Sequence, residues 1–212
     1  MRTASGLQDR VAELAEDLDV ECVLTTVVRE SVVVLAAAHL RSPMVGASFP
    51  FAAPLASVFA TWSSPERRKL WAENSRHLLG GVDRGFVDSA VARVRGRGYS
   101  VSVGEAMADS FNAIVGSPET DRTSLASLWS RVTEDYRRLE QSDHPERHVS
   151  SVQVPVFGSD GTAELELVLD GVGPGCDMDR YRSVVDAALV AGADLTRRIG
   201  GSPPPDYRPV RP

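Results

Sequence analysis

Apolar residues recur along the chain with two different spacings, one typical of helices and the other typical of strands. Residues 7–18 carry an apolar side chain at every third or fourth position with charged residues between them, which predicts an amphipathic helix. Residues 178–199 predict a longer helix, which Asp177 can cap and Gly200 can end. We therefore expect a long helix near each end of the chain.

Four other segments have the β-branched residues or the alternation that strands show. Residues 20–28 and 31–37 predict one antiparallel hairpin, buried on both faces. Residues 152–156 and 163–169 predict a second hairpin, with its turn at 158–161. An antiparallel sheet that contains both hairpins is the expected centre of the fold.

The middle of the chain predicts further helices and one more strand. Ser64-Pro65-Glu66 and Ser117-Pro118-Glu119 are typical helix starts, because serine can cap a helix and proline fits its first position. Residues 41–50 contain two prolines and a glycine and predict a loop. The other predicted elements are helices at about 54–62, 65–74, 86–95 and 125–139 and a strand at 99–103. This order indicates an α+β fold, with helices packed on an antiparallel sheet.

Three acidic residues fall on one face of the last predicted strand: Glu164, Glu166 and Asp170. Paired carboxylates can take part in acid–base catalysis or bind a cation. The other interpretation is a half-buried strand with one apolar face and one solvated face. We expect these three side chains to be solvated.

The composition narrows the classes of function. The chain has 212 residues, enough for one domain with an added segment, and its net charge of −6 does not favour binding to a phosphate backbone. Cys22 and Cys176 lie far apart and lack metal-ligand spacing. Residues 1–20 lack the apolar region of a signal peptide, and no apolar run is long enough to span a membrane. We expect a cytoplasmic protein without a membrane segment.

No motif in the sequence predicts catalysis, a metal site or a cofactor. The four histidines lack ligand spacing, and Gly171–Gly175 lacks the pattern of a phosphate-binding loop and predicts a turn. No G-x-S-x-G elbow is present. Residues 202–212 are rich in proline and are expected to be disordered. We expect a protein that is not an enzyme.

Five short segments resemble one known family in the order of its motifs. They are residues 13–18 (ELAEDL), 46–59 (GASFPFAAPLASVF), 95–101 (RGRGYSV), 153–161 (QVPVFGSDG) and 192–200 (GADLTRRIG). Together they resemble the effector-binding domain of IclR-type transcription regulators, which has a GAF-like fold. On this resemblance residues 1–19 form a linker helix and residues 20–201 form the effector-binding domain. Residues from about 105 to 147 are a helical insertion where the family has a short connection.

The resemblance implies a dimeric domain that senses a small organic effector and controls DNA binding or a partner through a ligand-biased conformation. The pocket is expected between the 49–59 segment and one face of the sheet. Its predicted lining is Phe49, Phe51, Ala53, Leu55, Tyr99, Val168 and Asp170. The alternative is a stand-alone GAF-like dimerisation or interaction module in which these side chains fill the core and no ligand binds.

Several positions depart from the family's pattern. The loop residues that the family has as His, Thr, Gly and Lys are here Ala52, Pro54, Ser57 and Val58. Two serines often found in the last strand correspond to Val168 and Asp170. In the family these positions help to hold small acidic effectors, and a carboxylate at position 170 would repel such a ligand.

The segment before the first predicted strand is the largest departure. It holds about twenty residues and one predicted helix, whereas a helix-turn-helix needs at least two helices and a turn. We expect no direct binding of nucleic acid by this chain alone.

Overall fold

The computed structural model describes residues 2–39, 45–79, 84–103, 122–141, 149–172 and 177–212. The element order is α1 (Arg2–Leu18), β1 (Glu21–Val28), β2 (Ser31–Ala38), β3 (Ser48–Pro50), α2 (Ser57–Thr61), α3 (Pro65–Leu79), α4 (Arg84–Arg97), β4 (Ser100–Val103), α6 (Arg122–Gln141), β5 (Val149–Phe157), β6 (Ala163–Asp170) and α7 (Met178–Arg198). The predicted α+β class is confirmed. The helix start at Ser117-Pro118 lies outside the described residues.

The strands form one sheet in the order β3-β2-β1-β6-β5-β4, and every neighbouring pair is antiparallel. Both predicted hairpins are present, and β1 pairs with β6 to join them at the centre of the sheet. The short edge strand β3 lies in a segment for which the sequence predicts a loop. It pairs with β2 through Phe49 and Val32.

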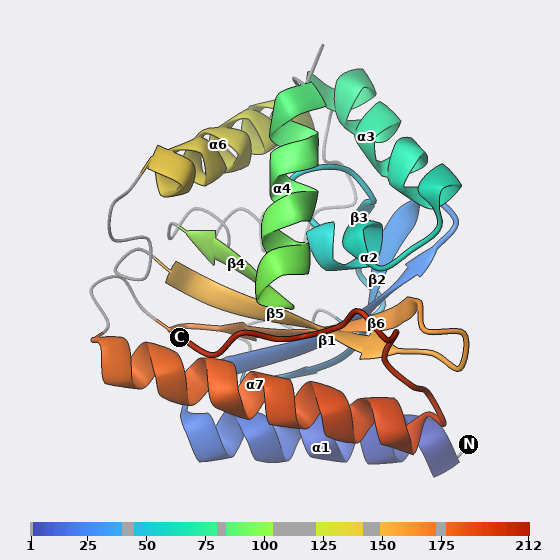
Figure 1. The fold of residues 1–212 in the computed structure, drawn as a ribbon, viewed down its shortest axis with the longest axis vertical. Helices are drawn as coiled ribbons and strands as arrows, with labels where there is room; N and C mark the ends of the chain where they lie inside the picture. Colours follow the sequence, from blue (N-terminus) through green and yellow to red (C-terminus); the bar gives the residue numbers. More distant parts are fainter. Residues whose placement is uncertain (1, 40–44, 80–83, 104–121, 142–148, 173–176) are drawn as a thin grey trace.

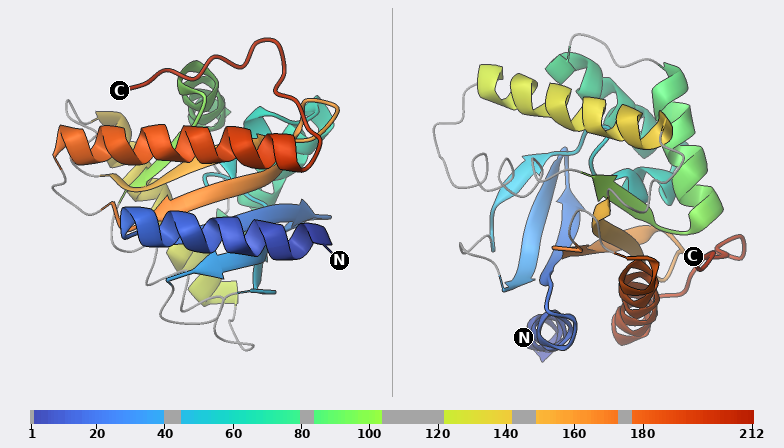
Figure 2. Two further views of the ribbon diagram at one scale, coloured as in Figure 1. Left: turned by 90° about the horizontal axis from the view of Figure 1, so that it is seen from below. Right: turned by 90° about the vertical axis from the view of Figure 1, so that its left-hand side faces the viewer.

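Helices cover both faces of the sheet (Figures 1 and 2). The long helices α1 and α7 lie side by side on one face, where α1 packs on β1 and β2 and α7 packs on β5 and β6. The other face is covered by α2, α3, α4 and α6, with α2 in contact with β5 and β6 and α6 in contact with β4. The sheet is therefore the middle layer of three.

Local signals account for the helix ends that matter for this packing. The Asp177 carboxylate accepts a hydrogen bond from the Arg180 amide (2.7 Å) and caps α7, and Gly200 ends that helix with a φ of 76°. The Ser64 hydroxyl accepts a hydrogen bond from the Arg67 amide (3.3 Å) at the start of α3. These caps agree with the predicted helix boundaries at both places.

The side chains of β6 alternate between the two layers. Leu165, Leu167 and Leu169 join the core that α1 and α7 cover. Glu166, between Leu165 and Leu167, is buried on the opposite face, which α2 and α6 cover. Because the helices of this second layer come from other parts of the chain, the alternation of β6 alone could not show that both its faces are covered.

The proline-rich tail is placed against the domain, in contrast to the disorder that its composition predicts (Figure 1). The Tyr207 ring lies edge-on to Trp62 and Phe157, with ring centroids 5.4 and 4.8 Å away. The Val210 amide donates to the Arg97 carbonyl (2.9 Å), and Asp206 pairs with Arg95 (2.6 Å). An aromatic anchor and backbone that proline already restricts lower the entropy cost of ordering this segment.

We expect Tyr207→Ala to lower the free energy of unfolding by about 2 kcal/mol, because it removes the aromatic contacts that fix the tail. Tyr207→Phe keeps the ring and should change stability by less than about 0.5 kcal/mol. Chemical denaturation of both variants measures the difference. Equal stability of wild type and Tyr207→Ala would show that the tail contributes nothing to the fold.

Candidate functional site

A row of buried polar side chains lies on the face of the sheet that α2 and α6 cover. Its members come from four neighbouring strands and are between 1% and 6% exposed: Thr25, Ser100, Ser102, Ser151, Gln153 and Glu166. The register brings them together, because Ser100 is opposite Gln153, Ser102 is opposite Ser151, and Thr25 is opposite Glu166. We call this set the polar face.

Hydrogen bonds connect most of the polar face into a network. The Gln153 amide Nε2 donates to Ser102 Oγ (3.1 Å) and to Ser151 Oγ (2.5 Å). Ser102 Oγ also lies 3.0 Å from the hydroxyl of Tyr136 on α6. Ser57, the first residue of α2, donates to Ser100 Oγ at 3.0 Å. Two covering helices are thus tied to β4 by side-chain hydrogen bonds.

Glu166 is the ionisable side chain of the polar face. It is 4% exposed, and among the described side chains its carboxylate accepts one long hydrogen bond, from Thr25 Oγ1 at 3.4 Å. Within the part of the chain that the structure describes, no arginine, lysine or histidine lies in ion-pair contact with it. Burial raises the pKa of Glu166 to about 8, and the Thr25 hydrogen bond lowers it only in part.

The expectation of a solvated acidic face is therefore wrong for Glu166. Glu164 is exposed as expected, and Asp170 is partly buried at the end of the strand. Burial raises the pKa of Asp170 to about 6, against the hydrogen bond from the Gly171 amide, and the nearby charge of Glu21 raises it further. The strand pattern suggested solvent on this face because the helices that cover it are distant in sequence.

Tyr136 faces this carboxyl from α6. Burial raises the pKa of its hydroxyl, while hydrogen bonds with Ser102 and Ser100 lower it, and the charge of Glu166 adds a smaller increase. The Tyr136 hydroxyl therefore stays protonated around neutral pH. It can donate a hydrogen bond to Ser102 or to a bound molecule.

Four of the predicted lining residues lie together beside the polar face. Phe49, Phe51, Ala53 and Leu55 are buried in one core cluster with α2, α3, α4 and α6. Their backbone is held from outside: the Trp71 indole donates to the Leu55 carbonyl (2.6 Å), and the Trp129 indole donates to the Ala53 carbonyl (3.0 Å). Two tryptophans from separate helices thus fix the segment that borders the polar face.

The other three predicted lining residues are divided between the two faces of the sheet. Val168 and Asp170 lie on the same face as Glu166, and Val168 packs near Val23 and Val34. Tyr99 lies on the opposite face, in the core beneath α1 and α7, where its hydroxyl is 3.2 Å from that of Tyr181. The structure thus separates Tyr99 from the rest of the predicted lining.

The sequence reasoning missed most of the polar face. Ser100 and Ser102 flank Val101, and Ser151 and Gln153 flank Val152, so each strand shows a polar position at every second residue. Each pattern alone is typical of a strand with one face toward water. Only the pairing of β4, β5, β6 and β1 shows that these positions meet in the interior.

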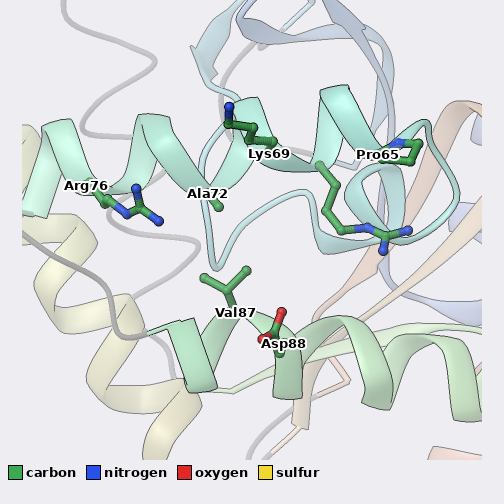
Figure 3. Close-up of a pocket in the computed structure, with 7 residues that line it drawn as sticks. Pro65, Lys69, Ala72, Arg76, Val87 and Asp88 are labelled. Carbon is green, nitrogen blue, oxygen red and sulfur yellow. The ribbon is translucent and has the colours of Figure 1, made fainter.

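A groove between α3 and α4 has a volume of about 360 Å³ (Figure 3). Arg68, Lys69 and Arg76 contribute its positive charge, and Asp88 faces them from α4. The Arg68 guanidinium already donates to the carbonyls of Ala60 (3.1 Å) and Thr61 (3.3 Å). The groove is separate from the polar face and holds no comparable network of buried polar groups.

The described residues contain no group of three His, Cys, Asp or Glu side chains placed to hold a metal ion. Cys22 is buried, and burial raises the pKa of its thiol to about 12, which keeps it in the unreactive protonated form. None of the helices in the described ranges combines the length and the apolar character that crossing a membrane requires. The chemistry of the polar face is that of hydrogen bonding and charge.

Comparison with solved structures relates this fold to a group of transcription regulators. An IclR-type transcriptional regulator from Silicibacter sp. TM1040 matches 98% of this chain and 70% of its own chain, with a TM-score of 0.63 and 17% identity. The IclR transcriptional regulator of Alicyclobacillus acidocaldarius matches 94% of this chain and 67% of its own, with a TM-score of 0.60 and 19% identity. The predicted resemblance is confirmed at the level of the fold.

A third solved structure carries a bound molecule. It is the inducer-binding domain of the PobR transcription factor from Acinetobacter, a double mutant in complex with 3-hydroxybenzoic acid. It matches 90% of this chain and 95% of its own, with a TM-score of 0.55 and 14% identity. No family model matches the chain, and no curated protein matches it by sequence.

Glu166→Gln should change how stability depends on pH. The folded protein holds the Glu166 proton more tightly than the unfolded chain does. This carboxyl therefore does not lower the free energy of unfolding below about pH 4.5, where it is protonated in both states. Its ionisation lowers the free energy of unfolding increasingly as pH rises toward about 8. The variant lacks this loss, so its advantage over wild type should grow to a few kcal/mol, at about 1.4 kcal/mol per unit of pKa difference.

Denaturation of both proteins at several pH values between about 5 and 8 measures this difference, and ionisations that both share cancel. Parallel stability curves for wild type and variant would mean that Glu166 ionises as easily in the folded protein as in the unfolded chain.

Proposed function

We propose that this chain is the effector-sensing domain of a transcription regulator and that its effector binds at the polar face. One observation carries the proposal: the buried polar face lies between the sheet and two covering helices, and among the described side chains its carboxylate, Glu166, accepts one long hydrogen bond, from Thr25. Such concentrations of polar groups in an otherwise apolar interior are typical of sites that orient a small ligand.

The solved structures support this proposal because they share this fold and because they are transcription regulators. Two are IclR-type transcription regulators, and the third, the inducer-binding domain of the PobR transcription factor, holds an aromatic hydroxy acid. A binding function fits the polar face, which offers hydrogen-bonding groups and, among the described residues, no activated nucleophile beside a base. The predicted homodimer and cytoplasmic location remain predictions.

The covering helices suggest how binding would reach the rest of the protein. Ser57 holds α2 to β4, and Tyr136 holds α6 to the same strand, each through one serine hydroxyl. A ligand that takes over either hydrogen bond changes the balance between two positions of that helix. The domain would then respond by a shift between conformations, with the size of the response set by the difference in affinity for the two.

A thermal-shift screen against small organic acids, amines and phenols tests the proposal. We expect at least one compound to raise the melting temperature of the wild type by about 5–10 °C at a hundredfold excess over its dissociation constant. Ser102→Ala should lose most of that shift, because Ser102 connects Gln153 with Tyr136.

Arg76→Ala is the matched control, because Arg76 lines the groove between α3 and α4 and not the polar face. It should keep the full shift. Failure of every compound would favour the alternative of an interaction module with a filled core. An equal shift in wild type and Ser102→Ala would place any binding elsewhere.

A further inference from the structure

The charges on the face of the sheet that contains the polar face are all negative in the described strands. Glu166 and Asp170 lie on β6, Glu21 lies on β1 opposite Asp170, and no lysine, arginine or histidine occupies a position of this face on any strand. A molecule bound against this face therefore meets carboxyl groups from the sheet and no compensating cation. That favours a positively charged ligand over a negatively charged one.

Three arginines of the helical layer, Arg67, Arg95 and Arg97, have other partners. The Arg67 guanidinium donates to the Val27 carbonyl (3.0 Å). Arg95 pairs with Asp206 and stacks on Trp62, with its guanidinium carbon 4.9 Å from the ring centroid. Arg97 lies over the ring of Tyr99 and acts on Tyr136 only through its charge. Among the described side chains, none of these cations is placed to neutralise Glu166.

The covering helices add hydrogen-bonding groups without adding positive charge. The residues of α2, Ser57–Thr61, include no titratable side chain. Among the described side chains of α6, Tyr136 is the titratable group that faces Glu166, and its hydroxyl is neutral around pH 7. From β1, Thr25 donates to Glu166, and Glu21 adds negative charge near Asp170. Among the described side chains, none thus compensates the Glu166 carboxylate with a positive charge.

From this arrangement we infer that Glu166 anchors an organic cation, and that the effector of this domain is a small amine or quaternary ammonium compound. The inference rests on the proposed function, since it assumes that the polar face is the effector site. A buried carboxylate is costly unless it is paired, and an ammonium group supplies the missing charge. The aromatic residues beside the polar face, Phe51 and Trp129 among them, suit the apolar part of such a ligand.

Without a bound cation, a proton neutralises Glu166 instead. Burial raises the pKa of this carboxyl to about 8, so it is mostly protonated at neutral pH. A bound cation displaces that proton, and affinity for the cation must therefore rise with pH until Glu166 is ionised in the free protein. A carboxylate ligand could bind only to protonated Glu166, so its affinity must fall over the same range of pH.

Four probes with the same aromatic body test the inference: benzyltrimethylammonium, benzylamine, benzyl alcohol and benzoate. Calorimetric titration of wild-type protein should show binding of the two cations and weaker or no binding of the others. Benzyltrimethylammonium keeps its charge at every pH, and its affinity should rise about tenfold between about pH 6 and pH 7. Glu166→Gln should lower that affinity at neutral pH and remove its dependence on pH.

Glu164→Gln is the matched control, because Glu164 lies two residues away on the same strand and is exposed. It should bind benzyltrimethylammonium as the wild type does. Melting temperatures of both variants establish that they are folded, and Glu166→Gln is expected to be at least as stable as wild type near pH 8.

The possible results separate this inference from the proposed function. If benzoate, or an uncharged or anionic compound from the thermal-shift screen, binds more tightly than both cations and loses its binding in Ser102→Ala, the polar face remains the effector site but the inference of a cationic effector is overturned. Binding of benzyltrimethylammonium that Glu166→Gln leaves unchanged also overturns it. If neither the four probes nor the screen yields a bound compound, both the inference and the proposed function fail.

Discussion

The pairing of β1 with β6 is the contact on which the rest of this structure depends. It joins two hairpins from distant parts of the chain and places Thr25 opposite Glu166, 141 positions away. Strand side chains alternate between faces, so a shift of one residue in this register would turn Leu165, Leu167 and Leu169 toward α2 and α6. It would also turn Glu166 into the apolar core beneath α1 and α7. The large apolar area on the leucine side fixes the register, and the position of the polar face follows from it.

The sequence predicts the elements of the fold better than it predicts their surroundings. Helices α1 and α7, both hairpins and the strand β4 follow from local periodicity and capping residues such as Asp177 and Ser64. The short helix α2 and the edge strand β3 are less distinct, because each is too brief for a periodic pattern. Which face of a strand meets water is a different question, since it depends on helices elsewhere in the chain.

The candidate site shows this limit most clearly. The resemblance to IclR-type regulators places Phe49, Phe51, Ala53 and Leu55 in one cluster, and they do lie together. It also suggests Tyr99, which lies on the opposite face of the sheet, beneath α1 and α7. The next residue, Ser100, takes the position toward α2 instead. Glu166 was expected in solvent, and its burial becomes visible only when α2 and α6 are in place.

The position of the C-terminal tail could not be predicted from the sequence either. No local pattern shows that Trp62 and Phe157 form a surface on which Tyr207 packs.

The distribution of tryptophan across the three layers has a spectroscopic consequence. All three tryptophans of the chain, Trp62, Trp71 and Trp129, are buried in the layer that covers the polar face. The layer of α1 and α7 has none and carries tyrosine instead, with Tyr181 beside Tyr99. Intrinsic tryptophan fluorescence therefore reports on one side of the sheet alone. A rearrangement of α2 or α6 would change the emission, whereas a movement confined to α1 and α7 would leave it unchanged.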